Sequence, residues 1–278
     1  MMNENRWLML GFAMMLILPL ALTTLAFYNL ATVKPEALVA GTPLVITPTA
    51  APAPTATPDP AQIYLDGLVA YQAGNYALAE TRFRSALAMS PRQANWHNSL
   101  GLALAQLGRL DEAIAEYQTA LSLDPALLEA HYNLGGAYHA LKDWANAEAA
   151  YRAALQVDPT LASAYVSLGN LYQDQGLAAE AVAAYQQAVA LEPDSPTAQL
   201  NLGVAYANPG DLAQAVAALE QAVTLAPDYA PAHYNLGVVY AYQANAAKAR
   251  QEFESVLKLA PESTWATQAR EQLAQLQP

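Results

Sequence analysis

The sequence predicts an all-α solenoid of six helix–turn–helix repeats, closed by a C-terminal helix and preceded by one transmembrane helix. Three residue types recur along the chain at intervals of 34 residues. The three series are Pro91, Pro125, Pro159, Pro193, Pro227 and Pro261; Gly67, Gly101, Gly135, Gly169, Gly203 and Gly237; and Ala79, Ala113, Ala147, Ala181, Ala215 and Ala249. A fixed period of this length is typical of stacked supersecondary repeats, which usually act through a long binding surface.

The first element is an apolar segment that follows a short tail, residues 1–6. Residues 7–28 carry no charged side chain, and at about 1.5 Å per residue they span roughly 33 Å, enough for a hydrocarbon core of about 30 Å. We therefore expect residues 7–30 to form a transmembrane anchor. A cleaved signal peptide is the alternative, with a small-x-small site at residues 38–40, although its apolar region is normally shorter.

Basic residues flank this segment unevenly. Arg6 and the amino terminus precede it, and Lys34 follows it. The positive-inside rule then places the N-terminus in the cytoplasm. We therefore expect a single-pass membrane protein whose repeats lie outside the cytoplasm.

Residues 31–60 form the second element, a stalk. Its second half reads GTPLVITPTAAPAPTATPDP and cannot form a core, because it is rich in proline, threonine and alanine. In an extended conformation of about 3.1 Å per residue, twenty residues reach roughly 60 Å. The segment could hold the repeats away from a membrane, or serve as a plain flexible spacer.

The repeats come next, and residues 128–161 show their design. Apolar residues recur at helical spacing in both halves of this stretch, and Lys142 and Asp143 separate the halves. Pro159 ends the second half, because proline disfavours helix at the residue before it. Each repeat is therefore predicted to be two helices joined by a short turn.

Small and large residues alternate where the two helices should cross. Gly135 and Ala147 let the helices approach closely, and Tyr138 and Tyr151 fill the space beside the crossing. These residues resemble the tetratricopeptide repeat family, whose pattern is Leu-Gly, then tyrosine, alanine, an aromatic residue, alanine and proline. The fourth repeat matches throughout, with Leu168, Gly169, Tyr172, Ala181, Tyr185, Ala188 and Pro193.

The resemblance covers residues 61–262 and implies six repeats wound into a right-handed superhelix. Single departures from the family pattern are Leu104, Leu219, Val256 and, in the first repeat, Asp66. A polar residue suits the first repeat, because it has no upstream neighbour to cover it. Residues 263–278 follow as a capping helix, with an apolar stripe of Trp265, Ala269, Leu273 and Leu276.

Composition argues against an enzyme. The chain has no cysteine, which excludes disulfides, thiolate metal sites and cysteine nucleophiles. No catalytic motif is present, and we expect neither a cofactor nor a metal. His97, His131 and His233 share one position in three repeats, so they lie at least a repeat apart and should not bind one metal.

The net charge of −12 is distributed unevenly, because no lysine or arginine occurs between Arg152 and Lys248. An acidic solenoid should repel nucleic acid. It could attract a basic partner, or the carboxylates could simply solvate the surface.

The resemblance implies that the first helix of each repeat lines a concave groove that binds a protein or peptide. The matching residues are Tyr64, Tyr71, Asn98, Tyr132, Asn133, His139, Asn170, Gln173, Asn201, Tyr234 and Asn235. Asn133, Asn201 and Asn235 share one position, and some members of the family hold extended peptides with such a ladder. An asparagine side chain can donate to and accept from a peptide backbone, so we expect these three to face water and a ligand.

The predicted function is a non-enzymatic, membrane-tethered scaffold whose groove binds a peptide segment or protein partner. Two alternatives remain: a structural module that self-associates to organise a membrane assembly, and an accessory subunit of a separate enzyme.

Overall fold

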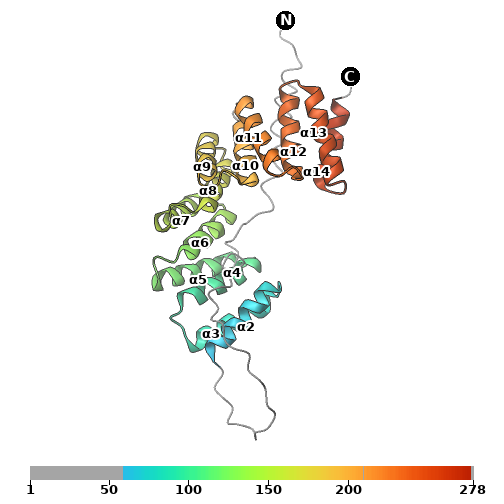
Figure 1. The fold of residues 1–278 in the computed structure, drawn as a ribbon. Helices are drawn as coiled ribbons and strands as arrows, with labels where there is room; N and C mark the ends of the chain where they lie inside the picture. Colours follow the sequence, from blue (N-terminus) through green and yellow to red (C-terminus); the bar gives the residue numbers. More distant parts are fainter. Residues whose placement is uncertain (1–58, 209, 277–278) are drawn as a thin grey trace. The chain divides into compact units, whose positions relative to one another are not determined.

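A computed structural model of the chain describes residues 59–208 and 210–276. These residues form thirteen α-helices, α2 to α14, and no strand, which confirms the all-helical prediction (Figure 1). None of the described helices is long and apolar enough to cross a membrane. The predicted anchor and nearly all of the stalk lie outside the described residues.

The described helices divide between two compact units, separated after Asp158. The N-terminal unit holds the first three repeats, and each repeat consists of two consecutive helices. Its helices are α2 (Pro60–Gln72), α3 (Tyr76–Met89), α4 (Ala94–Gln106), α5 (Leu110–Leu123), α6 (Leu128–Ala140) and α7 (Trp144–Val157).

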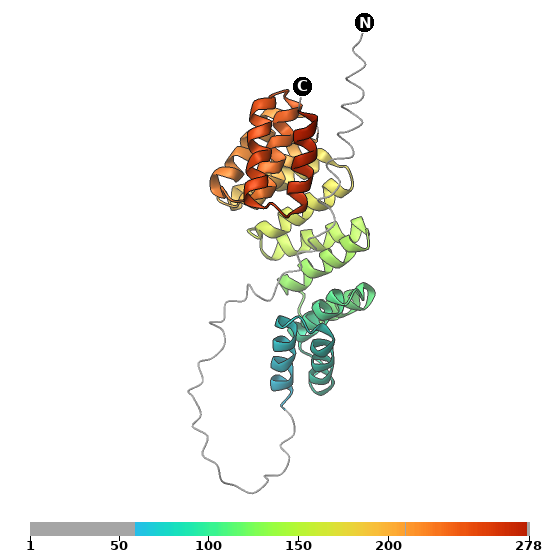
Figure 2. The same cartoon turned by 90° about the vertical axis from the view of Figure 1, so that its right-hand side faces the viewer.

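The C-terminal unit holds the last three repeats and the predicted capping helix. Its helices are α8 (Ala162–Asp174), α9 (Ala178–Leu191), α10 (Pro196–Ala207), α11 (Leu212–Leu225), α12 (Ala230–Tyr242), α13 (Ala246–Leu259) and α14 (Thr264–Gln275). Figure 2 shows α12, α13 and α14 packed side by side, seen from a second direction. Ala269 of α14 is fully buried, as expected for a helix that covers the end of the stack.

The turn inside each repeat depends on one backbone conformation. The residue two positions before the second helix begins has a positive φ in all six repeats, and four of these residues are glycines, for example Gly176 with φ 74°. Lys142 and Ala244 adopt the same conformation in the third and sixth repeats. Left-handed backbone is costly for residues with a Cβ atom, which explains the preference for glycine.

The crossing of the two helices in a repeat is as close as the sequence predicts. A Cβ atom added to Gly135 would lie 2.6 Å from Tyr151 Cδ1, and one on Gly169 would lie 2.5 Å from Tyr185 Cε1. The same contact recurs at Gly237, where Phe253 replaces the tyrosine. The aromatic ring therefore occupies the space that any other residue would need at the glycine.

Successive repeats are joined by a recurring hydrogen bond that the sequence analysis does not anticipate. Gln118 Nε2 donates to Tyr138 Oη at 3.0 Å, and Gln186 Nε2 donates to Tyr206 Oη at 2.7 Å. Both pairs join the second helix of one repeat to the first helix of the next. At the third such pair the direction reverses, because Tyr240 donates to the carboxylate of Glu220.

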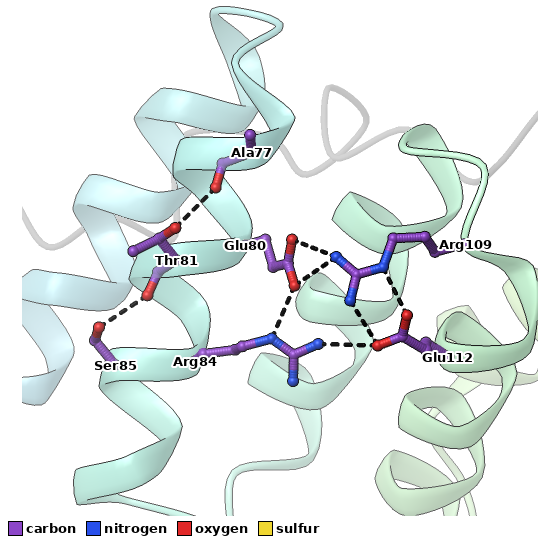
Figure 3. A network of polar contacts seen from close by, with 7 residues as sticks. All are labelled: Ala77, Glu80, Thr81, Arg84, Ser85, Arg109 and Glu112. Carbon is purple, nitrogen blue, oxygen red and sulfur yellow. Dashed lines mark hydrogen bonds and ion pairs between the residues drawn. The ribbon is translucent and has the colours of Figure 1, made fainter.

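A closed ion network joins the first two repeats on their second helices (Figure 3). Arg109 lies between Glu80 and Glu112, at 2.7 Å and 2.6 Å, and Arg84 contacts the same two carboxylates at 2.9 Å and 3.3 Å. The Arg109 guanidinium holds the pKa of Glu112 below its usual value. Because the network is largely exposed, its contribution is to orient α3 and α5 rather than to add much stability.

Candidate partner-binding face

The residues predicted to contact a partner all lie on the first helix of a repeat, and we call this set the first-helix face. The N-terminal unit contributes Tyr64, Tyr71, Asn98, Tyr132, Asn133 and His139. The C-terminal unit contributes Asn170, Gln173, Asn201, Tyr234 and Asn235. The two groups differ in how their polar atoms are used.

Tyr64 joins α2 to α4. Its hydroxyl donates to Ser99 Oγ at 2.9 Å, because Ser99 in turn donates its own proton to the carbonyl of Asn95. The Tyr64 ring stacks on Trp96 with 4.9 Å between ring centroids. Burial raises the pKa of the phenol. The Tyr64 side chain is therefore used to hold α2 against α4.

Asn133 repeats this contact one repeat later. Its Nδ2 donates to Asn98 Oδ1 at 3.0 Å, and like Tyr64 and Ser99 the two residues are 35 positions apart. Asn133 is 0 % exposed and Asn98 is 8 % exposed. The expectation that Asn133 faces water is therefore wrong, since its amide is sealed between α4 and α6.

The remaining predicted residues of the N-terminal unit make aromatic contacts. Tyr71 is buried with its ring 5.2 Å from that of Tyr76, and burial raises the pKa of Tyr71 to about 12. The ring of buried Tyr132 lies 5.7 Å from that of Tyr151. The half-buried His139 ring meets the rings of Trp144 and Tyr151 edge-on.

In the C-terminal unit, Tyr185 of the second helix α9 bonds to two residues of the first-helix face. Its hydroxyl donates to Asn170 Oδ1 at 2.6 Å and lies 3.3 Å from Gln173 Oε1. Burial raises the pKa of Tyr185. The two half-buried amide side chains are thus oriented by a hydroxyl from the second helix of their own repeat.

Asn201 and Asn235 are the residues of the face with hydrogen-bonding capacity to spare. Asn235 Nδ2 donates to the carbonyl of Pro231 at 2.8 Å, and Oδ1 receives no bond among the described residues. Asn201 is half-buried and makes no side-chain hydrogen bond within the described part of the chain. Val166 and Leu200 stand 35 positions before them, where the N-terminal unit has the polar partners Tyr64 and Asn98.

Tyr234, beside Asn235, combines burial with an unused hydroxyl. It is 3 % exposed, and its hydroxyl has no hydrogen-bond partner among the described residues. Its ring lies 5.2 Å from that of Trp265 on α14. Burial, followed by the charge of Glu271 and by Tyr242, raises the pKa of Tyr234 to about 12.

The three histidines at one repeat position hold the loops between repeats. The Nε2 atoms of His97, His131 and His233 lie 2.9 Å, 2.9 Å and 3.0 Å from proline carbonyl oxygens six residues earlier. No cluster of potential metal ligands occurs in the described residues. The histidines therefore have a separate structural role in each repeat.

His233 also contacts a carboxylate, since its Nδ1 lies 2.6 Å from Glu252 Oε2. Both ring nitrogens face acceptors, which only the protonated ring can satisfy. The bond to Glu252, helped by the Pro227 carbonyl and opposed by burial, raises the pKa of His233.

Replacing His233 with glutamine should remove part of the pH dependence of stability. The raised folded pKa means that the contribution of His233 is complete below its unfolded pKa of about 6.5 and is lost as the pH rises through the folded pKa. Gln199 holds the Pro193 carbonyl at the equivalent position, so glutamine should keep that contact. The difference in thermal midpoint between parent and variant should therefore be larger at acid pH. A difference that stays constant with pH would contradict this role of the His233–Glu252 contact. His131→Gln is the matched control, because His131 contacts the Pro125 carbonyl and no carboxylate among the described residues.

Most of the C-terminal unit lies in a stretch without lysine or arginine. No lysine or arginine occurs between Arg152 and Lys248, and the exposed carboxylates of Glu180, Glu192, Asp194 and Asp228 form no ion pair within the described residues. Unpaired carboxylates of one sign favour a partner that is neutral or basic over an acidic one.

Sequence models of repeat proteins match most of the chain. A tetratricopeptide repeat model matches residues 64–127 and 166–230, a TPR repeat model matches residues 135–176, and a further tetratricopeptide repeat model matches residues 209–273. Together they span more than half of the 278 residues. Comparison with the curated proteins finds no match.

Several solved structures share the fold. YrrB, a TPR protein with an unusual peptide-binding site, is 26 % identical over 68 % of this chain and 97 % of its own, with a TM-score of 0.55. MamA is 25 % identical over 62 % of this chain and 94 % of its own, with a TM-score of 0.55. PilF of Pseudomonas aeruginosa reaches a TM-score of 0.65 over 77 % of this chain and 97 % of its own, but at 18 % identity it shows the fold alone.

Proposed function

We propose that this chain, which belongs to the tetratricopeptide repeat family, is a non-enzymatic scaffold that binds an extended segment of a protein partner on the first-helix face of its C-terminal unit. Proteins of this family typically mediate protein–protein interaction. The similarity to YrrB, a TPR protein with a peptide-binding site, supports a peptide as the ligand.

The spare hydrogen-bonding capacity of the Asn201 and Asn235 amide groups is the observation that carries this proposal. Both side chains are half-buried, so the residues around them already restrict their motion. Asn235 keeps an unused acceptor, and Asn201 keeps both donor and acceptor. An amide with spare capacity at equivalent positions of adjacent repeats can pair with successive backbone groups of one extended peptide.

The N-terminal unit contributes less to binding in this proposal. Asn98 and Asn133 bond to each other, and Tyr64 bonds to Ser99, so a ligand would have to replace existing hydrogen bonds. Exchanging one bond for another gains little free energy. This half of the face is therefore assigned to holding the repeats together.

The proposal includes a membrane tether. The uncharged run of residues 7–28 supports an anchor, and the proline-rich residues 31–60 support a stalk that places the repeats outside the cytoplasm. A tethered scaffold would hold its partner near the membrane. Self-association and service as an accessory subunit of a separate enzyme remain the alternative hypotheses.

Changing Asn201 and Asn235 together to alanine should weaken binding of a cognate peptide roughly tenfold or more. Each lost backbone contact should cost about 0.5–1.5 kcal/mol, and every 1.4 kcal/mol is about a tenfold change in Kd. The probe is the tightest peptide selected from a random display library on the full-length chain, and calorimetry gives its Kd. The melting temperature should stay near that of the parent.

Asn146→Ala is the matched control, because Asn146 is exposed on the second helix α7 and bonds locally to Asp143. It should bind the peptide as the parent does. Equal affinity of the parent and the Asn201/Asn235 double variant would refute the assignment, as would a loss caused by Asn146→Ala.

A further inference from the structure

The first helix of the array, α2, exposes apolar side chains at positions that the later repeats bury. Val69 is 66 % exposed, whereas its counterparts at intervals of 34 residues are at most 2 % exposed. These counterparts are Ala103, Ala137, Leu171, Ala205 and Val239. Leu65, one helical turn before Val69, is 38 % exposed. We call Leu65 and Val69 the α2 end face.

In the later repeats, the helix that comes directly before the first helix packs against it. This contact joins α3 to α4, α5 to α6, α9 to α10 and α11 to α12. Ala103 of α4, the counterpart of Val69, shares an apolar cluster with Leu87 of α3. No described helix precedes α2. Its end face is therefore exposed because the covering element is not among the described helices.

The helix α3 does not cover the α2 end face, because it packs on the other side of α2. A Cβ atom added to Gly67 would lie 2.6 Å from Phe83 Cε1, so Gly67 faces α3. Leu65 and Val69 each lie two residues from Gly67, and two residues turn a helix by about 200°. The two apolar side chains thus point away from α3.

The C-terminal end of the array is closed in a different way. There α14 packs on α13, and no large apolar side chain of Thr264–Gln275 is exposed. Among its exposed residues are Thr267, Arg270 and Glu271. Terminal units of a repeat array need a polar outer face to stay soluble. α14 has such a face and α2 does not, so the N-terminal end requires a cover.

The chain directly before α2 contains one short aliphatic run. Residues 41–60 include Leu44, Val45 and Ile46, and their other residues are glycine, proline, threonine, alanine and one aspartate. Pro43 and Pro48 flank the run and favour an extended backbone. The run is thus the only part of this stretch that could bury large apolar side chains.

The linker between this run and α2 is long enough for the run to reach the α2 end face. Residues 47–58 lie between them and extend to roughly 37 Å at about 3.1 Å per residue. Val69 lies about 14 Å along the helix from Pro60, where α2 begins. The linker can therefore fold back without strain.

We propose that Leu44–Ile46 docks on the α2 end face and caps the N-terminal end of the array. In an extended chain, Leu44 and Ile46 point to the same side and lie about 6.6 Å apart. This spacing is close to the rise of about 6 Å between Leu65 and Val69 on the helix. The two pairs of side chains can therefore pack against each other.

A second copy of the chain fits the α2 end face less well. Stable interfaces bury about 1,200–2,000 Å² in total. The α2 end face consists of two apolar side chains, and the exposed polar residues Gln62, Asp66 and Gln72 surround it. A run held by a short linker has a high effective concentration at the face, so a small contact is enough to keep it there.

Docking has two consequences for the whole protein. It leaves residues 31–43 as the free part of the stalk, which reach about 40 Å when extended. It also covers the end of the array at which a second copy could stack. Removal of a signal peptide at residues 38–40 would leave the docking run in place.

Engineered cysteines test the contact, because the chain has none of its own. Val69→Cys is combined with Leu44→Cys or with Ile46→Cys in the full-length chain, since the direction of the run along α2 decides which lies nearer. One of these pairs should form an intramolecular disulfide at least about tenfold faster than the same stalk cysteines paired with Leu78→Cys. Leu78 is the matched control, because it is 41 % exposed and lies on α3 of the same repeat.

Hydrogen exchange measures the contact without cysteines. Replacing Leu44 and Ile46 together with serine should make the α2 amides exchange about tenfold faster, because the helix loses its apolar cover. Replacing Val33 and Val39 together with serine removes two aliphatic side chains from another part of the stalk and should leave α2 unchanged. All four positions lie outside the described helices, so the repeats should stay folded in both variants.

Three results would overturn the proposal. The first is an equal rate of disulfide formation at Val69 and at Leu78. The second is unchanged exchange of the α2 amides after serine replaces Leu44 and Ile46. The third is a disulfide-linked dimer of the variant that carries Val69→Cys alone, because a second copy would then cover the α2 end face.

Discussion

Replacing Gly169 with leucine is expected to destabilise the C-terminal unit by at least about 1–3 kcal/mol, the usual cost of forcing extra atoms into a packed core. Even the first added carbon would lie 2.5 Å from Tyr185 Cε1. The Tyr185 ring has little freedom to move, because it is 1 % exposed and its hydroxyl bonds to Asn170. Moving the ring would therefore break that bond as well as the packing.

The damage should spread along the stack, because each repeat is stabilised mainly by its neighbours. Amide hydrogen exchange should accelerate in α8 and α9 and also in α10 and α11. Ala179→Leu adds the same side chain at an exposed position of α9 and should leave exchange unchanged. If α8 to α11 of Gly169→Leu exchange like the parent, the close glycine–aromatic crossing does not hold the repeats together.

Full-length protein is expected to remain in membranes washed with alkaline carbonate, whereas a chain that begins at Ala61 should be recovered entirely in the wash. The uncharged residues 7–28 supply the reason, since a helix of that length roughly matches the hydrocarbon thickness of a bilayer. The effect should be all-or-none, because the repeats alone contain no described helix able to span a membrane.

Replacing Leu18 with arginine is the matched test within the full chain. A charged residue near the centre of the segment should lower membrane retention strongly, because burying its charge in hydrocarbon is costly. A natural N-terminus near Gly41, determined by sequencing the purified protein, would show instead that the segment is removed as a signal peptide.

The fold of the described residues is predictable from the sequence because its determinants are local and repeated. Gly135 and Tyr151 lie in one repeat, and their contact is implied by the same pair of positions in every other repeat. The turns are less obvious, since Lys142 and Ala244 take a backbone conformation that their residue types do not favour. At both turns the amide of the next residue donates to a carbonyl of the preceding helix, Asp143 to Tyr138 and Asn245 to Tyr240, as it does after the glycines.

The use of the first-helix face is less predictable, because it depends on pairs of residues in adjacent repeats. Asn133 and Asn201 occupy the same position, but Asn98 pairs with the first and Val166 stands before the second. Comparing residues 35 positions apart would have separated buried from available amides. The sequence also gives no sign of which buried tyrosine hydroxyls lack a partner. Those of Tyr117 and Tyr234 have none among the described residues, whereas that of Tyr185 donates to Asn170.

Where a bound peptide lies is the most direct test of the central claim, that the first-helix face of the C-terminal unit is the binding surface. The selected peptide, carrying a photoreactive residue at each position in turn, is cross-linked to the full-length chain, and the attachment sites are mapped by mass spectrometry. The cross-links should fall on α8, α10, α12 and α14, with those of consecutive peptide positions advancing in order along these helices. Attachment mainly to α9, α11 and α13, or to residues 59–158, would contradict the account.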